Sequence, residues 1–124
     1  MKQVHLEEID VQKLIMVGYQ EQSDDLLQYF TNRDFINRLH WEEWREFAVT
    51  LKDEELINLF KGLVIIEKQL NWLGGSVAGA IWIYKIIQER NLDTNKIIAD
   101  FGLKNSDNPW IPYGFPIYNR SDRK

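Results

Sequence analysis

Two strongly apolar stretches dominate the hydrophobic pattern of the chain, one on each side of a short glycine-rich segment. The first covers residues 59–73 and repeats its apolar side chains with helical spacing. Its apolar stripe consists of Leu56, Leu59, Phe60, Leu63, Ile66, Leu70 and Leu73. The second runs from Val77 to Tyr84 without a charged residue, which is typical of a helix buried on several sides. The pattern predicts a central helical hairpin.

Local signals mark the ends of both predicted helices. Thr50 to Asp53 matches the spacing of a capping box, and the acidic residues that follow suit the positive end of a helix dipole. Gly74 can adopt the left-handed conformation that often closes a helix, and Ser76 can cap the next helix. The sequence therefore predicts a tight turn at residues 74–76.

Small residues form one face of the second helix. Gly75 and Gly79 are spaced one turn apart, and alanines flank Gly79. Because glycine inside a helix costs about 1 kcal/mol relative to alanine, close packing against another helix would explain these residues. The uncharged run stops at Lys85, short of the roughly 20 residues that a bilayer requires, so no transmembrane helix is expected.

Shorter apolar patterns predict further helices before and after the hairpin. Residues 4–19 fit a helix or a short buried strand, and we favour the helix because no second convincing strand could pair with it. Further helices are expected around Leu26 to Phe30, Phe35 to Leu39, Trp41 to Leu51, and Ile97 to Phe101, with Gly102 near the end of the last one.

The C-terminal region has a different character. Residues 105–118 hold all three prolines and four aromatic side chains, which excludes a regular helix. We expect this tail to pack over the helices through Trp110, Tyr113 and Phe115, with an interface for a partner as the alternative. The sequence thus predicts one all-α domain over residues 1–118, a compact bundle of about five to six helices, with 119–124 as a frayed terminus.

Composition and charge narrow the range of functions. The absence of cysteine excludes disulfides and thiolate metal sites, and the N-terminus lacks an apolar signal core, so a cytoplasmic location is expected. The chain has a net charge of −4, but residues 1–62 carry 7 Lys and Arg against 13 Asp and Glu, which is −6. An acidic half argues against nucleic acid as the partner and suits a basic protein surface.

Few residues could support catalysis. His40 and Glu43 could share a helix face at i, i+3, with Glu46 or Glu42 near, which leaves a small hydrolase or metal-dependent enzyme as an alternative reading. That site lacks further ligands and the HExxH spacing of a zinc protease. Gly74 to Ser76 could hold an anion through backbone amides but lacks the lysine of a P-loop. We therefore expect no catalytic residue, no metal site and no cofactor.

Two motifs resemble small bacterial helical proteins of uncharacterised function. Residues 71–78 read NWLGGSVA, and residues 107–114 read DNPWIPYG. They are similar to a Gly-Gly-Ser-Val turn and an Asn-Pro-aromatic-x-Pro-aromatic-Gly ending, and the likeness covers roughly residues 50–115. This resemblance implies a compact domain and transfers no catalytic residue.

The charge pattern favours a non-enzymatic protein-binding module. We expect an acidic face on two successive helices to bind a basic protein partner, with indole rings adding apolar contacts where they are partly exposed. The residues of this face are Glu42, Glu43, Glu46, Asp53, Glu54, Glu55, Trp41 and Trp44. Small size and acidity are also compatible with a toxin-neutralising protein of the immunity or inhibitor type. The oligomeric state stays open.

Overall fold

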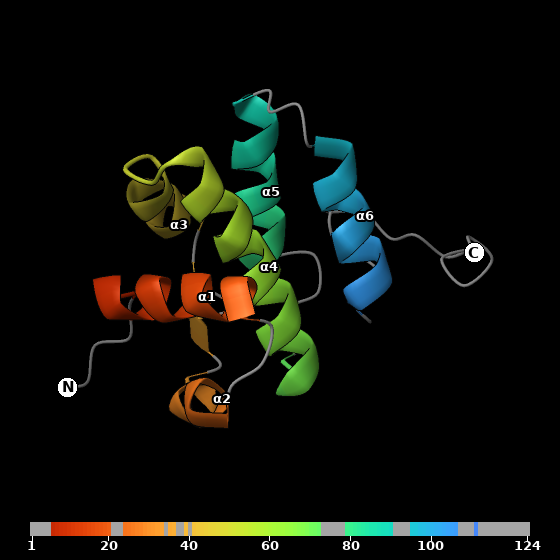
Figure 1. The fold of residues 1–124 in the computed structure, drawn as a ribbon. Coiled ribbons are helices and arrows are strands. Elements are labelled where there is room, and N and C mark those ends of the chain that lie inside the picture. Colours follow the sequence, from red (N-terminus) through yellow and green to blue (C-terminus); the bar gives the residue numbers. More distant parts are fainter. Residues whose placement is uncertain are drawn as a thin grey trace.

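The computed structural model is all-helical over the residues that it describes, which are 6–20, 24–33, 35–36, 39, 41–72, 79–90, 95–106 and 111. Within these residues six α-helices follow one another and no strand occurs (Figure 1). The helices are α1 (Glu8–Gln20), α2 (Asp24–Phe30), α3 (Trp41–Ala48), α4 (Asp53–Gln69), α5 (Gly79–Glu89) and α6 (Asn95–Asn105). The predicted all-α class and number of helices are confirmed.

Helix α4 occupies the middle of the arrangement. It contacts α1, α2, α5 and α6, while α5 also contacts α3 and α6. In Figure 1, α1 runs across α4, α2 lies below α1, and α6 stands on the right. The predicted pairing of α4 and α5 at the centre is confirmed, although its turn, residues 73–78, lies outside the described residues.

The core between these helices is built mainly from fully buried aliphatic side chains. Those contributed by α4 and α5 are Leu56, Leu59, Leu63, Val64, Ile66, Ile81, Ile83 and Ile87. Burying one such side chain contributes about 1.5–3 kcal/mol relative to leaving it in water. The apolar stripe read from the sequence therefore forms the core up to Ile66.

Helix α1 packs on α4 through two glycines. A methyl group at Gly62 would overlap the carbonyl oxygen of Leu14, and a methyl group at Gly18 would overlap the carbonyl oxygen of Asn58. Only a hydrogen in place of a side chain lets two backbones come this close. Within the described part of residues 4–19, the structure thus settles the open choice in favour of a helix from Glu8 onward, and it places a close contact between helices at a pair of glycines that the sequence did not single out.

Gly79 makes a second close contact, between α5 and α3. A Cβ atom at Gly79 would lie 2.6 Å from Cζ2 and 3.0 Å from Cε2 of Trp44, whose side chain is fully buried. The predicted close packing of this face is confirmed for Gly79, and its neighbour is an indole ring on α3. Gly75 lies outside the described residues.

The cap of α4 differs from the predicted one. Glu55 accepts a hydrogen bond from the backbone N–H of Lys52, with an Oε1···N distance of 2.9 Å. Thr50 instead donates its hydroxyl to the carbonyl of Phe47 at 2.8 Å, in the last turn of α3. The prediction of a Thr50 cap is wrong because Lys52 is the residue that precedes α4, while the Thr50 hydroxyl and the Thr50 backbone N–H both donate to the Phe47 carbonyl. The acidic first turn, Asp53 to Glu55, is confirmed.

Helix α4 also ends earlier than Gly74. Its last residue is Gln69, and Asn71 adopts a left-handed conformation with φ 56°. The N–H of Trp72 then donates to the carbonyl of Glu67 at 2.9 Å, which closes the last turn. Asparagine can replace glycine at such a position because its short polar side chain tolerates this conformation. The predicted end at Gly74 is therefore wrong.

The predicted α-helix around residues 35–39 is corrected in its described part. Phe35 and Ile36 form a short 3₁₀ turn, in which the N–H of Ile36 donates to the carbonyl of Arg33 at 3.1 Å. Arg33 is held by its side chain to Asp10 of α1, with Nε at 2.9 Å from Oδ1. This distant ion pair fixes the chain at the point where local pattern alone predicts a new helix.

The last helix continues through Gly102, where the sequence predicted its end, and stops at Asn105. A Cβ atom at Gly102 would lie 3.0 Å from Cζ of Phe60 and 3.2 Å from Cγ2 of Ile111. The missing side chain at Gly102 therefore lets Phe60 and Ile111 pack closely against α6. Ile111 is fully buried, so this residue of the proline-rich tail lies in the core. Trp110, Tyr113 and Phe115 lie outside the described residues.

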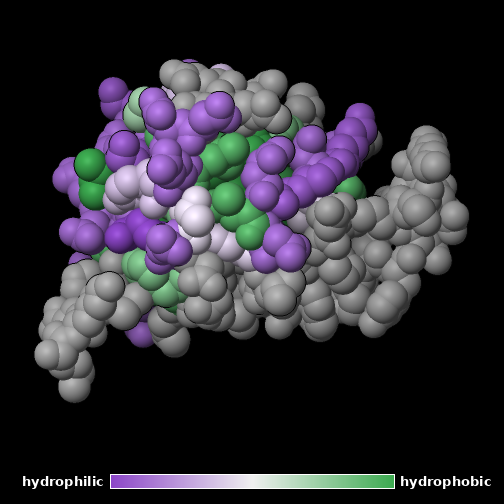
Figure 2. Space-filling view, turned by 90° about the horizontal axis from the view of Figure 1, so that it is seen from below, coloured by the Kyte–Doolittle hydropathy of each residue, from purple (hydrophilic) through white to green (hydrophobic). Residues whose placement is uncertain are grey.

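Polar side chains cover most of the described surface that Figure 2 shows, with a group of hydrophobic atoms between them. Large apolar side chains that are exposed in the described part of the chain are Ile9, Met16, Tyr19 and Val49. Within that part, no helix has both the length and the apolar character needed to cross a bilayer.

The glycine contact between α1 and α4 can be tested by adding a methyl group. We expect Gly62→Ala to lower the free energy of unfolding by at least about 2 kcal/mol, because the new Cβ would push the α1 backbone away from α4. The same change in an uncrowded helix stabilises by up to about 1 kcal/mol. Urea denaturation of both proteins gives the difference.

A matched control is Gln88→Ala on the exposed surface of α5, which should change the stability by less than about 0.5 kcal/mol. A Gly62→Ala protein as stable as the wild type would show that the two backbones are not in contact.

Candidate functional site

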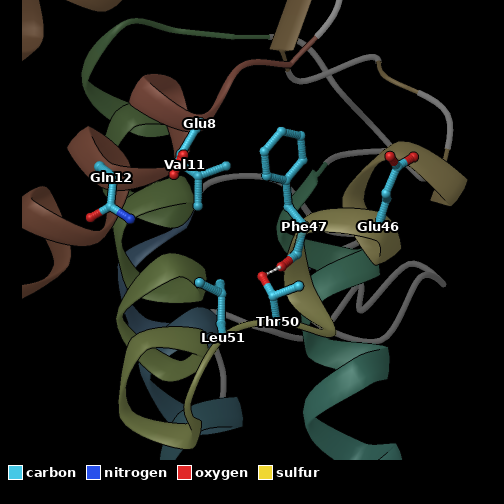
Figure 3. Close-up of a pocket in the computed structure, with 7 residues that line it drawn as sticks. All are labelled: Glu8, Val11, Gln12, Glu46, Phe47, Thr50 and Leu51. Carbon is cyan, nitrogen blue, oxygen red and sulfur yellow. Dashed lines mark hydrogen bonds between the residues drawn. The ribbon is translucent and has the colours of Figure 1, made fainter.

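A groove lies between the N-terminal half of α1 and the end of α3. It encloses a volume of about 280 Å³ and combines apolar and polar side chains. The lining residues are Glu8, Val11, Gln12, Glu46, Phe47, Thr50 and Leu51 (Figure 3). Two helices far apart in the sequence therefore supply its opposite walls.

The side chains of α3 are directed by the burial of its other face. Trp44 and Ala48 are fully buried, which anchors the helix on the core. Glu46 is consequently exposed, whereas Phe47 is partly buried against the core, and Figure 3 shows its ring directed into the space beside α1. The Thr50 hydroxyl lies below the ring and is hydrogen-bonded to the carbonyl of Phe47. The local fold thus presents an aromatic ring inside the groove.

Two carboxylates stand at the groove with no neutralising partner among the residues that the structure describes. Glu8 and Glu46 are exposed, and neither forms a hydrogen bond or ion pair with another residue in the described part of the chain. Figure 3 shows them on opposite sides of the Phe47 ring. The groove therefore has an apolar interior, formed with Val11 and Leu51, and a negatively charged edge.

Two residues of the predicted acidic face hold the groove in shape. Glu43 accepts a hydrogen bond from the backbone N–H of Leu6 at 2.8 Å, which ties the start of α1 to α3. Glu54 accepts a hydrogen bond from the Tyr19 hydroxyl at 2.9 Å, which ties the end of α1 to α4. This bond is the main reason that the pKa of Tyr19 is raised. These carboxylates position helices and are occupied within the chain.

Asp53 and Glu55 also have partners within the chain. Glu55 forms the cap of α4 with the N–H of Lys52. Asp53 pairs with Arg90 at 3.0 Å, and the same guanidinium donates to the carbonyl of Ala48 at 2.9 Å. Arg90 therefore joins the ends of α3 and α5 to the start of α4. The structure does not bring these two carboxylates into the groove.

The two indoles of the predicted face differ in exposure. Trp44 is fully buried against Gly79 and is inaccessible in this conformation. Trp41 is partly buried, with its ring centroid 5.9 Å from that of Trp82 and the Arg45 guanidinium 5.1 Å from its own centroid. Glu42 is exposed. Of the predicted residues, Glu46 is the one that lines the groove.

The remaining groove residues were not identified from the sequence. Glu8, Val11 and Gln12 belong to a segment for which a helix and a strand were both considered, and Phe47 was predicted only as part of the helix from Trp41 to Leu51. A usable signal was the acidic first turn of α1, which favours a helix whose outer face carries charge. That this end of α1 lies beside α3 could not be read from the sequence, because it depends on the tertiary contacts of α1.

A buried ion pair lies on the other side of α1. Asp10 is fully buried and accepts hydrogen bonds from Arg33 Nη2 at 2.8 Å and Arg33 Nε at 2.9 Å. The Tyr29 hydroxyl and the Glu7 backbone N–H add bonds of 2.7 Å and 2.9 Å. With its acceptor positions filled by donors from three segments, Asp10 joins α1 to α2 and to the chain after α2. The cluster is structural.

The buried ion pair shifts the ionisation of its neighbours. Burial and the hydrogen bond to Asp10 raise the pKa of Tyr29 to about 12. The hydrogen bond to Asp10 also raises the pKa of Arg33. With these raised pKa values, Tyr29 and Arg33 retain the protons that they donate to Asp10.

His40, which the alternative enzyme reading requires, lies outside the described residues. Glu43, its expected neighbour, accepts a hydrogen bond from the backbone N–H of Leu6. Among the residues that are described, no group of three potential metal ligands comes together.

Comparisons with known proteins add no identity. No family model, no curated protein and no solved structure matches the chain.

The raised pKa of Tyr29 predicts a pH dependence of stability. An unfolded tyrosine ionises near pH 10, whereas the folded chain keeps this proton up to about pH 12. The stabilisation is therefore fully present below pH 10 and is lost as the pH rises through about 12. We expect the melting temperature to fall more steeply over this range in the wild type than in Tyr29→Phe. Parallel slopes would show that Tyr29 ionises as easily in the folded state as in the unfolded one.

Proposed function

We propose that the chain is a protein-binding module that recognises a basic partner at the groove between α1 and α3. The observation that carries this proposal is the pairing of an apolar interior with two unneutralised carboxylates, Glu8 and Glu46, at one groove. Apolar contacts give affinity when they lose water, and charges around them select the partner and speed its approach.

Exposed apolar side chains adjacent in sequence to groove residues support the proposal. Ile9 follows Glu8 and is 53% exposed, and Val49 precedes Thr50 and is 57% exposed. A protein laid across the groove would remove this apolar surface from water, which contributes roughly 25 cal/mol per Å². The opening would therefore be the centre of a wider contact area that α1 and the end of α3 provide together.

The overall charge agrees with a basic partner. The first half of the chain is acidic, and the carboxylates of Glu43, Glu54 and Glu55, although hydrogen-bonded within the chain, still contribute to its negative field, whereas Asp53 is paired with Arg90. A basic toxin is one partner of this kind, and binding it would make the chain a toxin-neutralising protein of the immunity or inhibitor type. The charge supports this extension of the proposal.

A comparison of two double variants tests the proposed site. Glu8→Gln/Glu46→Gln removes both carboxylates of the groove. Asp24→Asn/Asp25→Asn removes two exposed carboxylates from the first turn of α2 and serves as the control with the same change in charge. Each full-length protein would be used to capture partners from its native host at low salt, and the captured partner would then be purified for kinetic measurements.

We expect the wild type and the control to retain the same basic protein. The groove variant should associate with it about tenfold more slowly, with a weaker dependence on salt, because electrostatic steering is reduced. Circular dichroism would confirm that all three proteins fold. Equal association rates for the groove variant and the control, or a captured partner without a basic surface, would contradict the proposal.

A further inference from the structure

The chemistry of the groove points to one particular anchor. We propose that it receives a single arginine side chain of the partner, with the guanidinium over the Phe47 ring and between Glu8 and Glu46. This inference rests on the proposed function and specifies the group that the partner inserts. It follows from the acceptor character of the polar lining, the aromatic interior and the small volume.

The polar lining offers acceptors to a ligand. Glu8 and Glu46 accept hydrogen bonds only, as ionised carboxylates do. Thr50 has already donated its one hydroxyl proton to the carbonyl of Phe47, so its oxygen meets the groove as an acceptor. The Gln12 amide can turn its oxygen toward a donor. Such a set fits a cation that only donates and repels an anionic ligand.

The apolar lining fits the stem of a long basic side chain. Leu51 and the edge of Phe47, which are partly exposed, provide carbon surface below the charged edge, and the buried Val11 lies at the base of the groove. Arginine and lysine bury their methylene groups along such surfaces and keep the charged head near water or carboxylates. The volume of about 280 Å³ is at the small end for a ligand pocket, which suits one side chain better than a larger ligand.

An aromatic ring between two carboxylates favours arginine over lysine. The planar guanidinium stacks on a ring and can donate toward two carboxylates at once, whereas an ammonium is a compact and strongly hydrated charge. Both kinds of cation lie over rings within the chain: Arg45 is 5.1 Å from the centroid of Trp41, and Lys13 is 4.8 Å from that of Tyr29, so the preference for arginine rests on the two carboxylates. Phe47 offers a ring over which no cation of the described residues lies.

Arginine blocked at both ends, as the N-acetyl methylamide, is the probe for this inference. Titration of the isotope-labelled full chain, followed by NMR, should shift the amide signals of Val11, Phe47 and Thr50 with a dissociation constant in the millimolar range. Blocked citrulline, which has the same shape without the charge, should bind at least about tenfold more weakly. Blocked lysine should fall between the two.

Three variants assign the contacts. Glu8→Gln/Glu46→Gln should weaken arginine binding about fivefold, since exposed charge pairs are individually weak. The control Asp24→Asn/Asp25→Asn should bind as the wild type does. Phe47→Leu keeps apolar volume but removes the ring, so it should weaken the binding of arginine and lysine alike. Shifts elsewhere on the molecule, or equal binding of arginine and citrulline, would overturn the inference.

The two proposals fail separately. If the groove variant loses its captured partner but the wild type ignores blocked arginine, the proposed function holds and the arginine anchor is wrong. If blocked arginine binds in the groove while the partner binds the groove variant unchanged, the arginine site exists and the proposed function is wrong.

Discussion

The contact of α1 with α4 is the interaction on which the rest of the structure depends. Gly18 and Gly62 bring the two backbones together where any side chain would overlap a carbonyl group of the other helix. This position of α1 places Asp10 within reach of Arg33 and sets the N-terminal half of α1 beside α3. The buried ion pair on one side of α1 and the groove on the other are therefore two results of one packing arrangement.

Local pattern predicted those parts of the fold that depend on local rules. The helical spacing of Leu56 to Ile66, the uncharged face of α5 and the acidic first turn of α4 all follow from residues close together in the sequence. The ends of the helices were harder to predict. Asn71 closes α4 in place of Gly74, because a hydrogen bond from Trp72 stabilises the left-handed turn there. Propensity ranks glycine first for such a turn but does not fix where the helix stops.

The candidate site was predictable only in part. The sequence indicated an acidic surface on α3 and α4, and Glu46 does line the groove. It could not show that Glu43 and Glu54 are bonded to Leu6 and Tyr19, because those partners lie on α1 or just before it. Likewise, Asp10 lies in a segment where polar and apolar residues alternate irregularly. Its complete burial depends on Arg33 and Tyr29, which are distant in sequence and donate hydrogen bonds to it. A linear sequence shows charges but not their partners.

Native-state hydrogen exchange tests most directly whether α1 and α4 form one packed unit. If the glycine contact organises the fold, the buried amides of α1 around Leu14 should exchange only through global unfolding, with the same free energy as those of α4 around Leu63. A fraying or loosely attached α1 would behave differently. Its amides would exchange through a local opening well below the global free energy, while α4 and α5 stayed protected, and that result would contradict the account.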